Sequence, residues 1–289
     1  MTGAGLDPGE VVDVVERALS EDLGGDPGRD VTTEATVPAD QAGPAQLVAR
    51  ADGVVAGLPL VPVVLGATAR RLGLEPPAVE LRVADGDAVS AGDVIAVLTG
   101  PVRVLLVAER TLLNLVCRIS GVATATRRWA DALDGTGARV LDTRKTTPGL
   151  RALEKYAVRC GGGTNKRMGL YDVAMIKDNH KVAAGSVSAA YAAVREAFPD
   201  VEIQVEVTTV AEAREAVEAG ARFLLCDNMA VDLLREVVHA VGGEGVELEA
   251  TGGLTLERAR EVAETGVDYL SVGALTHSAP VLDVALDLS

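Results

Sequence analysis

The feature that most constrains the fold is a repeating pattern that begins at residue 138. An apolar run of strand length is followed by a polar tip, and in most repeats a helical segment comes next. Strands that alternate with helices at this spacing predict parallel βα units. The candidate strands are residues 138–143, 172–177, 201–207, 222–228, 246–253 and 268–273, and the candidate helices are residues 209–219, 230–240 and 255–265.

Six βα units can build either an open doubly wound sheet or a barrel. In an open sheet, only the strands near the switch point carry functional residues at their carboxyl ends. Here nearly every candidate strand ends in polar residues, and a ring of such residues around one mouth is typical of a barrel. We therefore expect an α/β barrel, and we assign it to residues 116–275.

The chain before the barrel shows short alternating runs that break at Asp-Gly and Ala-Gly pairs. This pattern predicts antiparallel strands and hairpins. We expect an α+β domain over residues 1–115, with an apolar run in residues 276–289 that pairs back with it. The expected elements are a helix at 8–20, a polar loop at 21–36, strands within 45–57 and 79–105, a helix at 58–72, and a long helix at 104–134 with Gly121 as a candidate break.

The composition argues against several classes of protein. A formal net charge of −15 and an isoelectric point of about 4.7 speak against binding to nucleic acid or to an anionic membrane surface. No apolar run approaches the roughly 18 residues of a membrane span, and the first residues do not resemble a signal peptide. Three scattered cysteines, Cys117, Cys160 and Cys226, predict reduced thiols rather than disulfides or a zinc site. We therefore expect a cytoplasmic protein.

One segment, Val140–His180, runs against the acidic balance of the chain. Counted with Lys181 just beyond it, it holds nine Lys and Arg residues against four Asp and Glu residues. A basic island in an acidic protein indicates a small anionic ligand. Arg144, Lys145 and Lys177 follow apolar runs, which favours a functional role. Solvated helix faces explain equally well the three basic residues with helical spacing, Arg151, Lys155 and Arg159.

The polar residues at the strand ends differ in charge along the chain. The first two tips are cationic, the next two carry carboxylates, and the last two offer glycine and hydroxyl groups. Arg suits a carboxylate and Lys suits a phosphate, while exposed backbone N–H groups before a helix also bind phosphate. In chain order these residues are Arg144, Lys145, Arg167, Lys177, Glu206, Asp227, Thr251, Gly252, Gly253 and Gly273.

Such a ring suits a substrate with carboxylates at one end and a phosphate at the other. Positive charge that develops between them would lie near Glu206 and Asp227, as in glycosyl transfer through an oxocarbenium-like centre, or in a Mg²⁺–pyrophosphate complex. A Schiff-base lyase that uses Lys145 or Lys177 stays open as an alternative. The three histidines, His180, His239 and His277, are too few and too scattered for a metal triad.

Several segments closely resemble the quinolinate phosphoribosyltransferase family, the decarboxylating nicotinate-nucleotide pyrophosphorylases of NAD synthesis. The block DTRKTTPGLRALEKYAVRCGGGTNKRMGLYD at residues 142–172 is the most specific of them. The likeness covers nearly the full length of the chain. The other segments are residues 21–33, 108–115, 176–180, 224–228, 249–253 and 264–278.

The resemblance implies an N-terminal α/β sandwich domain followed by an incomplete six-stranded parallel α/β barrel. It implies a homodimer whose active sites lie between the barrel of one subunit and the N-terminal domain of the other. The implied substrates are quinolinate and phosphoribosyl pyrophosphate, with Mg²⁺ holding the pyrophosphate. The implied products are nicotinate mononucleotide, pyrophosphate and CO₂.

The resemblance also implies roles for individual residues. Lys145, Lys177, Glu206 and Asp227 form the catalytic set, and Glu206 and Asp227 lie in the metal region. The acceptor side consists of Thr143, Arg144, Lys145, Lys166 and Arg167, together with the partner subunit's Arg110. The phosphate side consists of Thr251, Gly252, Gly253 and Gly273, with His277 near it.

Two positions depart from the family pattern. Thr251 replaces a Ser and keeps its hydroxyl, while Lys166 replaces a His expected against the acceptor carboxylates. Lys is longer, more flexible and more strongly hydrated than His. This change leaves open an enzyme for a different pyridine or aromatic acid. A non-catalytic binding protein on the same scaffold is the more remote alternative.

Overall fold

The computed structural model describes residues 5–243 and 245–288, and the chain divides into two compact units. The first unit comprises Met1–Arg127, Thr146–Gly162 and Ser278–Ser289, and the second comprises Arg128–Lys145 and Gly163–His277. The division falls inside helix α4 (Val102–Ala132), whereas the ranges predicted from sequence meet at residues 115 and 116. In the described residues no helix is long and apolar enough to cross a membrane.

The first unit contains a four-stranded antiparallel sheet. Its strand order is β12 (Val284–Leu288), β1 (Ala42–Ala49), β5 (Val94–Pro101) and β3 (Ala78–Leu81), and β2 (Gly53–Val54) pairs separately with β4 (Ala88–Val89). The last strand of the chain is therefore an edge of this sheet, where Ala45 lies opposite Leu288. Alternate residues of β1, Ala45, Leu47 and Ala49, are fully buried and form one side of the core.

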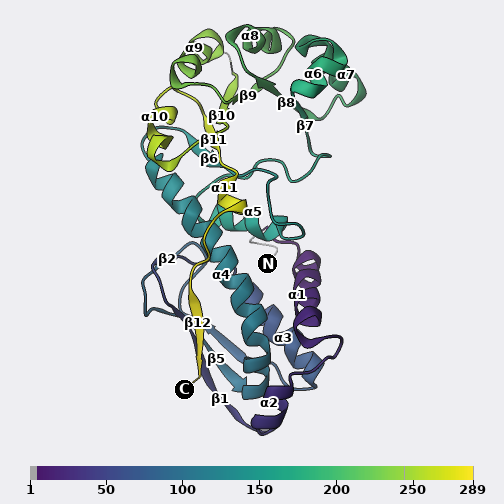
Figure 1. Cartoon of the computed structure of the whole chain (residues 1–289), viewed down its shortest axis with the longest axis vertical. Helices are drawn as coiled ribbons and strands as arrows, with labels where there is room; N and C mark the ends of the chain where they lie inside the picture. Colours follow the sequence, from purple (N-terminus) through teal and green to yellow (C-terminus); the bar gives the residue numbers. More distant parts are fainter. Residues whose placement is uncertain (1–4, 244, 289) are drawn as a thin grey trace. The chain divides into compact units, whose positions relative to one another are not determined.

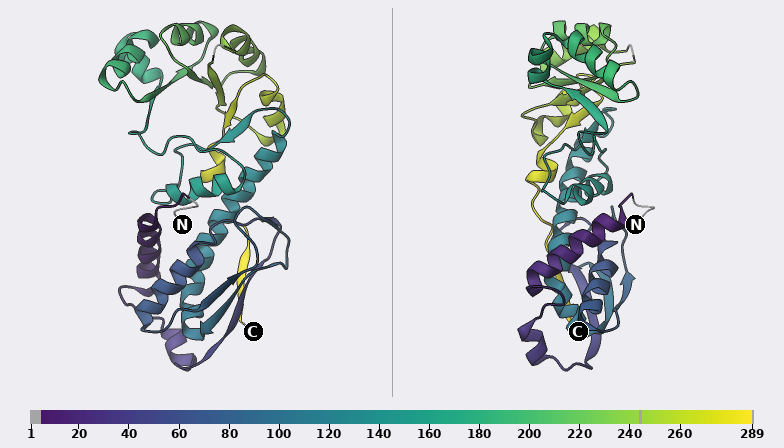
Figure 2. Two further views of the ribbon diagram at one scale, coloured as in Figure 1. Left: turned by 180° about the vertical axis from the view of Figure 1, so that it is seen from behind. Right: turned by 90° about the vertical axis from the view of Figure 1, so that its right-hand side faces the viewer.

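Helices α1 (Pro8–Leu23), α3 (Leu60–Leu72) and α4 gather on one side of this sheet (Figure 2). The predicted helices at 8–20 and 58–72 are therefore confirmed. The expected loop at 21–36 is partly wrong, because α1 continues to Leu23 and α2 (Val31–Thr36) follows. Asp30 starts α2 as its N-cap, since its carboxylate accepts hydrogen bonds from the Thr32 and Thr33 N–H groups.

Helix α4 is continuous, so the candidate break at Gly121 is wrong. A Cβ at residue 121 would lie 2.1 Å from the Pro280 carbonyl oxygen. This glycine therefore permits a close backbone approach and does not end the helix. The helix begins at Val102, two residues before the predicted start at 104, so residues 102 and 103 are helical where a strand was expected.

Helix α5 (Arg151–Cys160) belongs to the first unit and buries two charged residues, Glu154 and Lys155. The solvated-face interpretation is therefore wrong for Lys155, which is 1% exposed. The Glu154 carboxylate accepts hydrogen bonds from Arg118 at 2.7 Å and from the Thr147 backbone N–H at 2.9 Å. The bond from Arg118 ties the segment 146–162 to α4, in agreement with its grouping with the first unit, and the bond from Thr147 holds the segment's own loop against α5.

The second unit is built on a six-stranded sheet in the order β6-β11-β10-β9-β8-β7. Its five strand pairings are all parallel, and none joins β6 to β7 among the described residues. The expected incomplete six-stranded parallel α/β barrel is thus confirmed. Its strands are β6 (Arg139–Leu141), β7 (Val173–Ile176), β8 (Glu202–Val207), β9 (Phe223–Asp227), β10 (Glu247–Thr251) and β11 (Tyr269–Ser271).

Helices follow the strands, and α6 to α10 lie along the outer side of the sheet (Figure 1). They are α6 (Asp178–Ala184), α7 (Val187–Ala197), α8 (Val210–Glu218), α9 (Val231–Val241), the 3₁₀ turn η2 (Leu256–Arg258), α10 (Ala259–Ala263) and α11 (Ala274–His277). The helix expected at 255–265 is shorter because its first turn is the 3₁₀ turn and Gly266, with a φ of +96°, follows its end. Parallel strands bring all their carboxyl ends to one edge of the sheet.

Candidate active site

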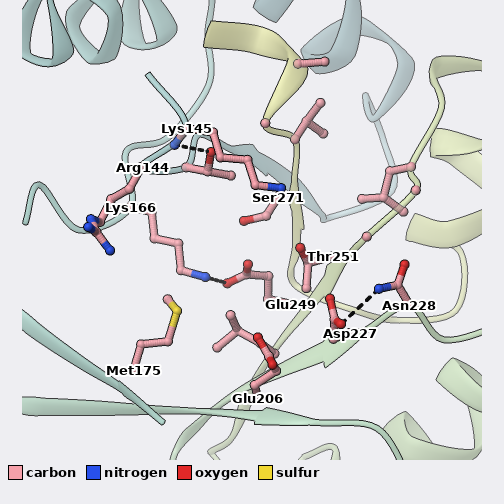
Figure 3. A pocket seen from close by; sticks show the side chains of 18 of the residues that line it. Arg144, Lys145, Lys166, Met175, Glu206, Asp227, Asn228, Glu249, Thr251 and Ser271 are labelled. Carbon is pink, nitrogen blue, oxygen red and sulfur yellow. Dashed lines mark hydrogen bonds and ion pairs between the residues drawn. The ribbon is translucent and has the colours of Figure 1, made fainter. Parts of the chain in front are cut away.

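A cavity of about 590 Å³ lies at the carboxyl ends of the six parallel strands, entirely within the second unit (Figure 3). It brings together every site residue predicted from sequence except Arg110, which lies exposed on α4 in the first unit. The predicted residues that line it are Thr143, Arg144, Lys145, Lys166, Arg167, Lys177, Glu206, Asp227, Thr251, Gly252, Gly253, Gly273 and His277.

The loop after β6 is held in place by hydroxyl groups. The Lys145 backbone N–H donates to Thr143 Oγ1 at 3.0 Å, and the Lys145 carbonyl accepts from Thr276 Oγ1 at 2.7 Å. Gly273 lies against the side chains of Lys145 and His277, since a Cβ at residue 273 would be 3.0 Å from Lys145 Cδ and 3.2 Å from His277 Nε2. A larger residue at 273 would therefore push Lys145 or His277 aside.

Arg167 completes the cationic side of the cavity. Its Nη1 donates to the Val173 carbonyl at 2.7 Å, which fixes the guanidinium at the start of β7. Burial lowers the pKa of Arg167, and the neighbouring positive charge of Arg144 lowers it further. Two guanidinium groups brought together in this way favour a bound anion between them.

The carboxylates lie across the cavity, at the ends of β8 and β9. Glu206 forms an ion pair with Lys177 at 2.8 Å, and Asp227 accepts a hydrogen bond from Asn228 at 3.0 Å. Lys177 precedes α6, where its backbone N–H donates to His180 Nδ1 at 2.9 Å. The Lys177 side chain is half exposed, so an incoming anionic ligand can compete with Glu206 for its ammonium group.

The turn after β10 approaches the end of β9 closely. Gly252 and Gly253 have φ angles of +90° and +60°, and a Cβ on Gly252 would lie 2.3 Å from Asn228 Oδ1. Glycine is therefore required at 252 both by the backbone conformation and by the contact. Successive turn N–H groups of this kind form an anion-binding concavity, which fits the expected phosphate side.

Three polar residues that line the cavity, Asn228, Glu249 and Ser271, were not predicted from sequence, nor was the buried Asp142 that supports Lys166. Asp142, which is fully buried, accepts hydrogen bonds from Asn165 Nδ2 at 2.6 Å and from the Lys166 backbone N–H at 2.9 Å. Glu249 forms an ion pair with Lys166. The period-2 alternation of a strand was the available signal, because Glu249 lies two residues before Thr251 on the same face.

The carboxylates of the cavity do not form a complete metal cage. Over residues 5–243 and 245–288, no group of three or more His, Cys, Asp or Glu side chains is placed to hold a metal ion. Glu206 and Asp227 supply two carboxylates at most. A hard cation here would therefore take most of its oxygen ligands from a substrate and from water.

The second unit is a parallel α/β barrel whose mouth holds cations on one side and carboxylates and a glycine turn on the other. This arrangement is typical of an enzyme that brings two anionic substrates together. Two family models match this chain. The N-terminal domain of quinolinate phosphoribosyl transferase matches residues 30–120, and its C-terminal domain matches residues 122–287. The chain belongs to the quinolinate phosphoribosyltransferase family.

Curated relatives and solved structures agree with this assignment. Nicotinate-nucleotide pyrophosphorylase (carboxylating) of Mycobacterium leprae is 47% identical over 278 residues, which cover 96% of each chain. Quinolinate phosphoribosyltransferase (decarboxylating) 1b of Nicotiana tabacum is 40% identical and is covered over 81% of its length by 95% of this chain. The structure of nicotinate-nucleotide pyrophosphorylase from Francisella tularensis superposes with a TM-score of 0.91 at 32% identity, over 98% of both chains.

Proposed function

We propose that this chain transfers phosphoribose from phosphoribosyl pyrophosphate to quinolinate with loss of CO₂, and so makes nicotinate mononucleotide for NAD synthesis. The observation that carries the proposal is the sorting of charge within one cavity. Arg144 and Arg167 are neighbouring cations, and Glu206 and Asp227 lie on the other side of the cavity from Arg144 (Figure 3). A dicarboxylate acceptor and a sugar that develops positive charge require this separation.

The chain's own residues bind and orient the two substrates. Arg144, Lys145 and Arg167 hold the acceptor carboxylates so that the ring nitrogen faces the anomeric carbon. A nitrogen–carbon bond forms as the carbon–pyrophosphate bond breaks, and Glu206 and Asp227 stabilise the positive charge on the sugar in between. The carboxylate beside the nitrogen then leaves as CO₂, its electron pair stays on the ring carbon next to the pyridinium, and a proton takes its place.

Mg²⁺ is part of the proposal. Two carboxylates, one of them already paired with Lys177, fit an ion held mainly by pyrophosphate and water, with Glu206 and Asp227 as outer partners. When bound, Mg²⁺ would neutralise the negative charge that develops on the leaving pyrophosphate. Turnover that persists unchanged after chelation of divalent ions would contradict this part.

We further propose a cytoplasmic homodimer with shared active sites. The exposed position of Arg110 on α4 supports a role at a site outside its own unit. The three cysteines are free, which suits a reducing compartment.

A different pyridine or aromatic acid as the acceptor was the alternative, because Lys166 was expected to be a flexible and hydrated cation. Its ammonium is instead buried and paired with Glu249, which removes much of the reason to expect a different acid. A non-catalytic binding protein is also disfavoured, since both carboxylates are present in the cavity.

Product analysis tests the proposed function. Purified protein with quinolinate, phosphoribosyl pyrophosphate and Mg²⁺ should yield nicotinate mononucleotide and pyrophosphate in equal amounts. A parallel series of other pyridine and benzoic acids should react much more slowly. A faster reaction with another acid would reassign the acceptor, and no product with any acid would overturn the proposed transfer.

A further inference from the structure

The floor of the cavity contains an ion pair that none of the proposed chemical steps uses. Lys166 lies between β6 and β7, and its ammonium contacts the Glu249 carboxylate of β10. The two side chains are only 7% and 1% exposed. Figure 3 shows the Lys166 side chain pointing toward Glu249, with the pair drawn between Arg144 and Thr251.

Lys166 is held at both ends. Its backbone N–H donates to Asp142 Oδ1 at 2.9 Å, and its ammonium lies 5.6 Å from the centre of the Phe223 ring as well as against Glu249. Phe223 is fixed in turn by a stacked contact with Tyr269, whose ring centre is 5.7 Å away. The Lys166 side chain is therefore held in one position, in contrast to the flexible, hydrated cation expected from sequence.

The charges of the pair cancel inside a desolvated site. A buried ion whose partner is removed keeps its full desolvation penalty, so either single charge would act strongly on a nearby ligand. Burial lowers the pKa of Lys166, and Glu249 opposes that effect. Glu249 Oε1 and Ser271 Oγ are buried without a hydrogen-bond partner in the described part of the chain, so the floor also offers polar atoms to whatever lies above it.

We propose that Glu249 sets the affinity of the cavity for its acceptor by fixing Lys166 and cancelling its charge. The Lys166–Glu249 pair then helps to position the acceptor but adds no net charge to the cavity. Arg144, Lys145 and Arg167 alone select a dicarboxylate by charge. This inference rests on the proposed function, because it concerns the acceptor side of the same cavity. It makes the balance within the pair, rather than the Lys166 cation alone, the quantity that sets acceptor affinity.

Opposite single substitutions should therefore have opposite effects on quinolinate binding by the full chain. Lys166→Met strands a buried carboxylate beside an anionic ligand and should raise the Kd of quinolinate by roughly tenfold or more. Glu249→Gln leaves a positive charge and should keep the Kd at or below the wild-type value. The double variant restores neutrality and should return the Kd to within about threefold of wild type.

Calorimetric titration with quinolinate measures these values without requiring turnover. The matched control is the exposed pair Arg260 and Glu264, 3.1 Å apart, where Arg260→Met with Glu264→Gln should leave the Kd unchanged. A double variant that binds as weakly as Lys166→Met would show that Lys166 is a direct ligand and would overturn the inference. A higher Kd for Glu249→Gln would overturn it too, and this test stands if Lys166→Met fails to fold.

The two proposals can fail separately. Quinolinate that binds with this pattern but is not converted would overturn the proposed function and support the role of Glu249. Quinolinate that is converted while Glu249→Gln and the double variant both lose affinity would leave the function intact and remove the proposed role of Glu249. Wild-type protein that does not bind quinolinate at all would overturn the inference.

Discussion

Several charged residues of the cavity are held in place by a neighbour. Lys177 reaches Glu206 at 2.8 Å, and Asp142 fixes the backbone of Lys166 at 2.9 Å. Arg167 is tied to the Val173 carbonyl. A substitution should therefore affect the substrate that meets that residue more than the other substrate, and the two KM values can be used to separate the roles.

Arg144→Ala should weaken the binding of quinolinate far more than the binding of phosphoribosyl pyrophosphate. Loss of a bidentate partner from a desolvated carboxylate costs roughly 2–5 kcal/mol. Arg144→Lys keeps the charge but lacks the planar guanidinium, so its affinity for quinolinate should lie between those of the wild type and Arg144→Ala. Steady-state kinetics with each substrate varied in turn provide the check, and an equal rise of both KM values would contradict the acceptor role.

At the scale of elements, the barrel strands and most of the polar residues at their ends were predictable. Each repeated βα unit produces the same pattern, an apolar run followed by a polar end. Glu249 was missed because it lies one step inside the strand rather than at its tip. Lys155 was misread because helical spacing does not tell which face is buried. Gly121 was misread because its contact, Pro280, lies far away in sequence.

The glycine turn after β10 gives a prediction for the donor side. Gly252→Ala should destabilise the protein and raise the KM of phosphoribosyl pyrophosphate, because its Cβ would lie 2.3 Å from Asn228 Oδ1. Gly185→Ala is the control, with a φ of +97° and nothing within 4 Å. Both variants bear the strain of a left-handed residue, roughly 1–2 kcal/mol. Equal KM values for the two would contradict a contact-dependent role.

Helix α4 gives a prediction of stability alone. Gly121→Ala should lower the Tm, since its Cβ would collide with the Pro280 carbonyl oxygen. Gly66→Ala in α3 meets nothing nearer than Arg70 Nη1 at 3.9 Å and should raise stability by about 0.5–1 kcal/mol through helix propensity. Thermal unfolding followed by circular dichroism distinguishes the two, and a stabilised Gly121→Ala would show that the backbones are not in close contact.

At the scale of the whole molecule, the family match covers both units, and thirteen of the fourteen predicted site residues line one cavity of the second unit. Arg110 is the exception and belongs to the first unit. A site that needs Arg110 from another subunit would make the dimer the functional molecule. This arrangement could not come from residue spacing, because spacing describes one chain.

Subunit mixing tests that arrangement. Arg110→Ala and Lys145→Ala proteins should each be inactive, while an equal mixture should recover about a quarter of wild-type activity if symmetric dimers exchange at random. The recovery arises because each hybrid dimer contains one intact site. Each variant mixed with itself is the control. No recovery, despite hybrid dimers seen by native mass spectrometry, would place Arg110 outside the shared site.

Phosphoribosyl transfer to quinolinate should proceed with loss of the carboxylate beside the ring nitrogen. Quinolinate labelled with ¹³C in that carboxylate should release the label as CO₂ in equal amount with pyrophosphate, and should leave unlabelled nicotinate mononucleotide. A nucleotide that retains the label, or pyrophosphate release without any pyridine nucleotide, would contradict the account.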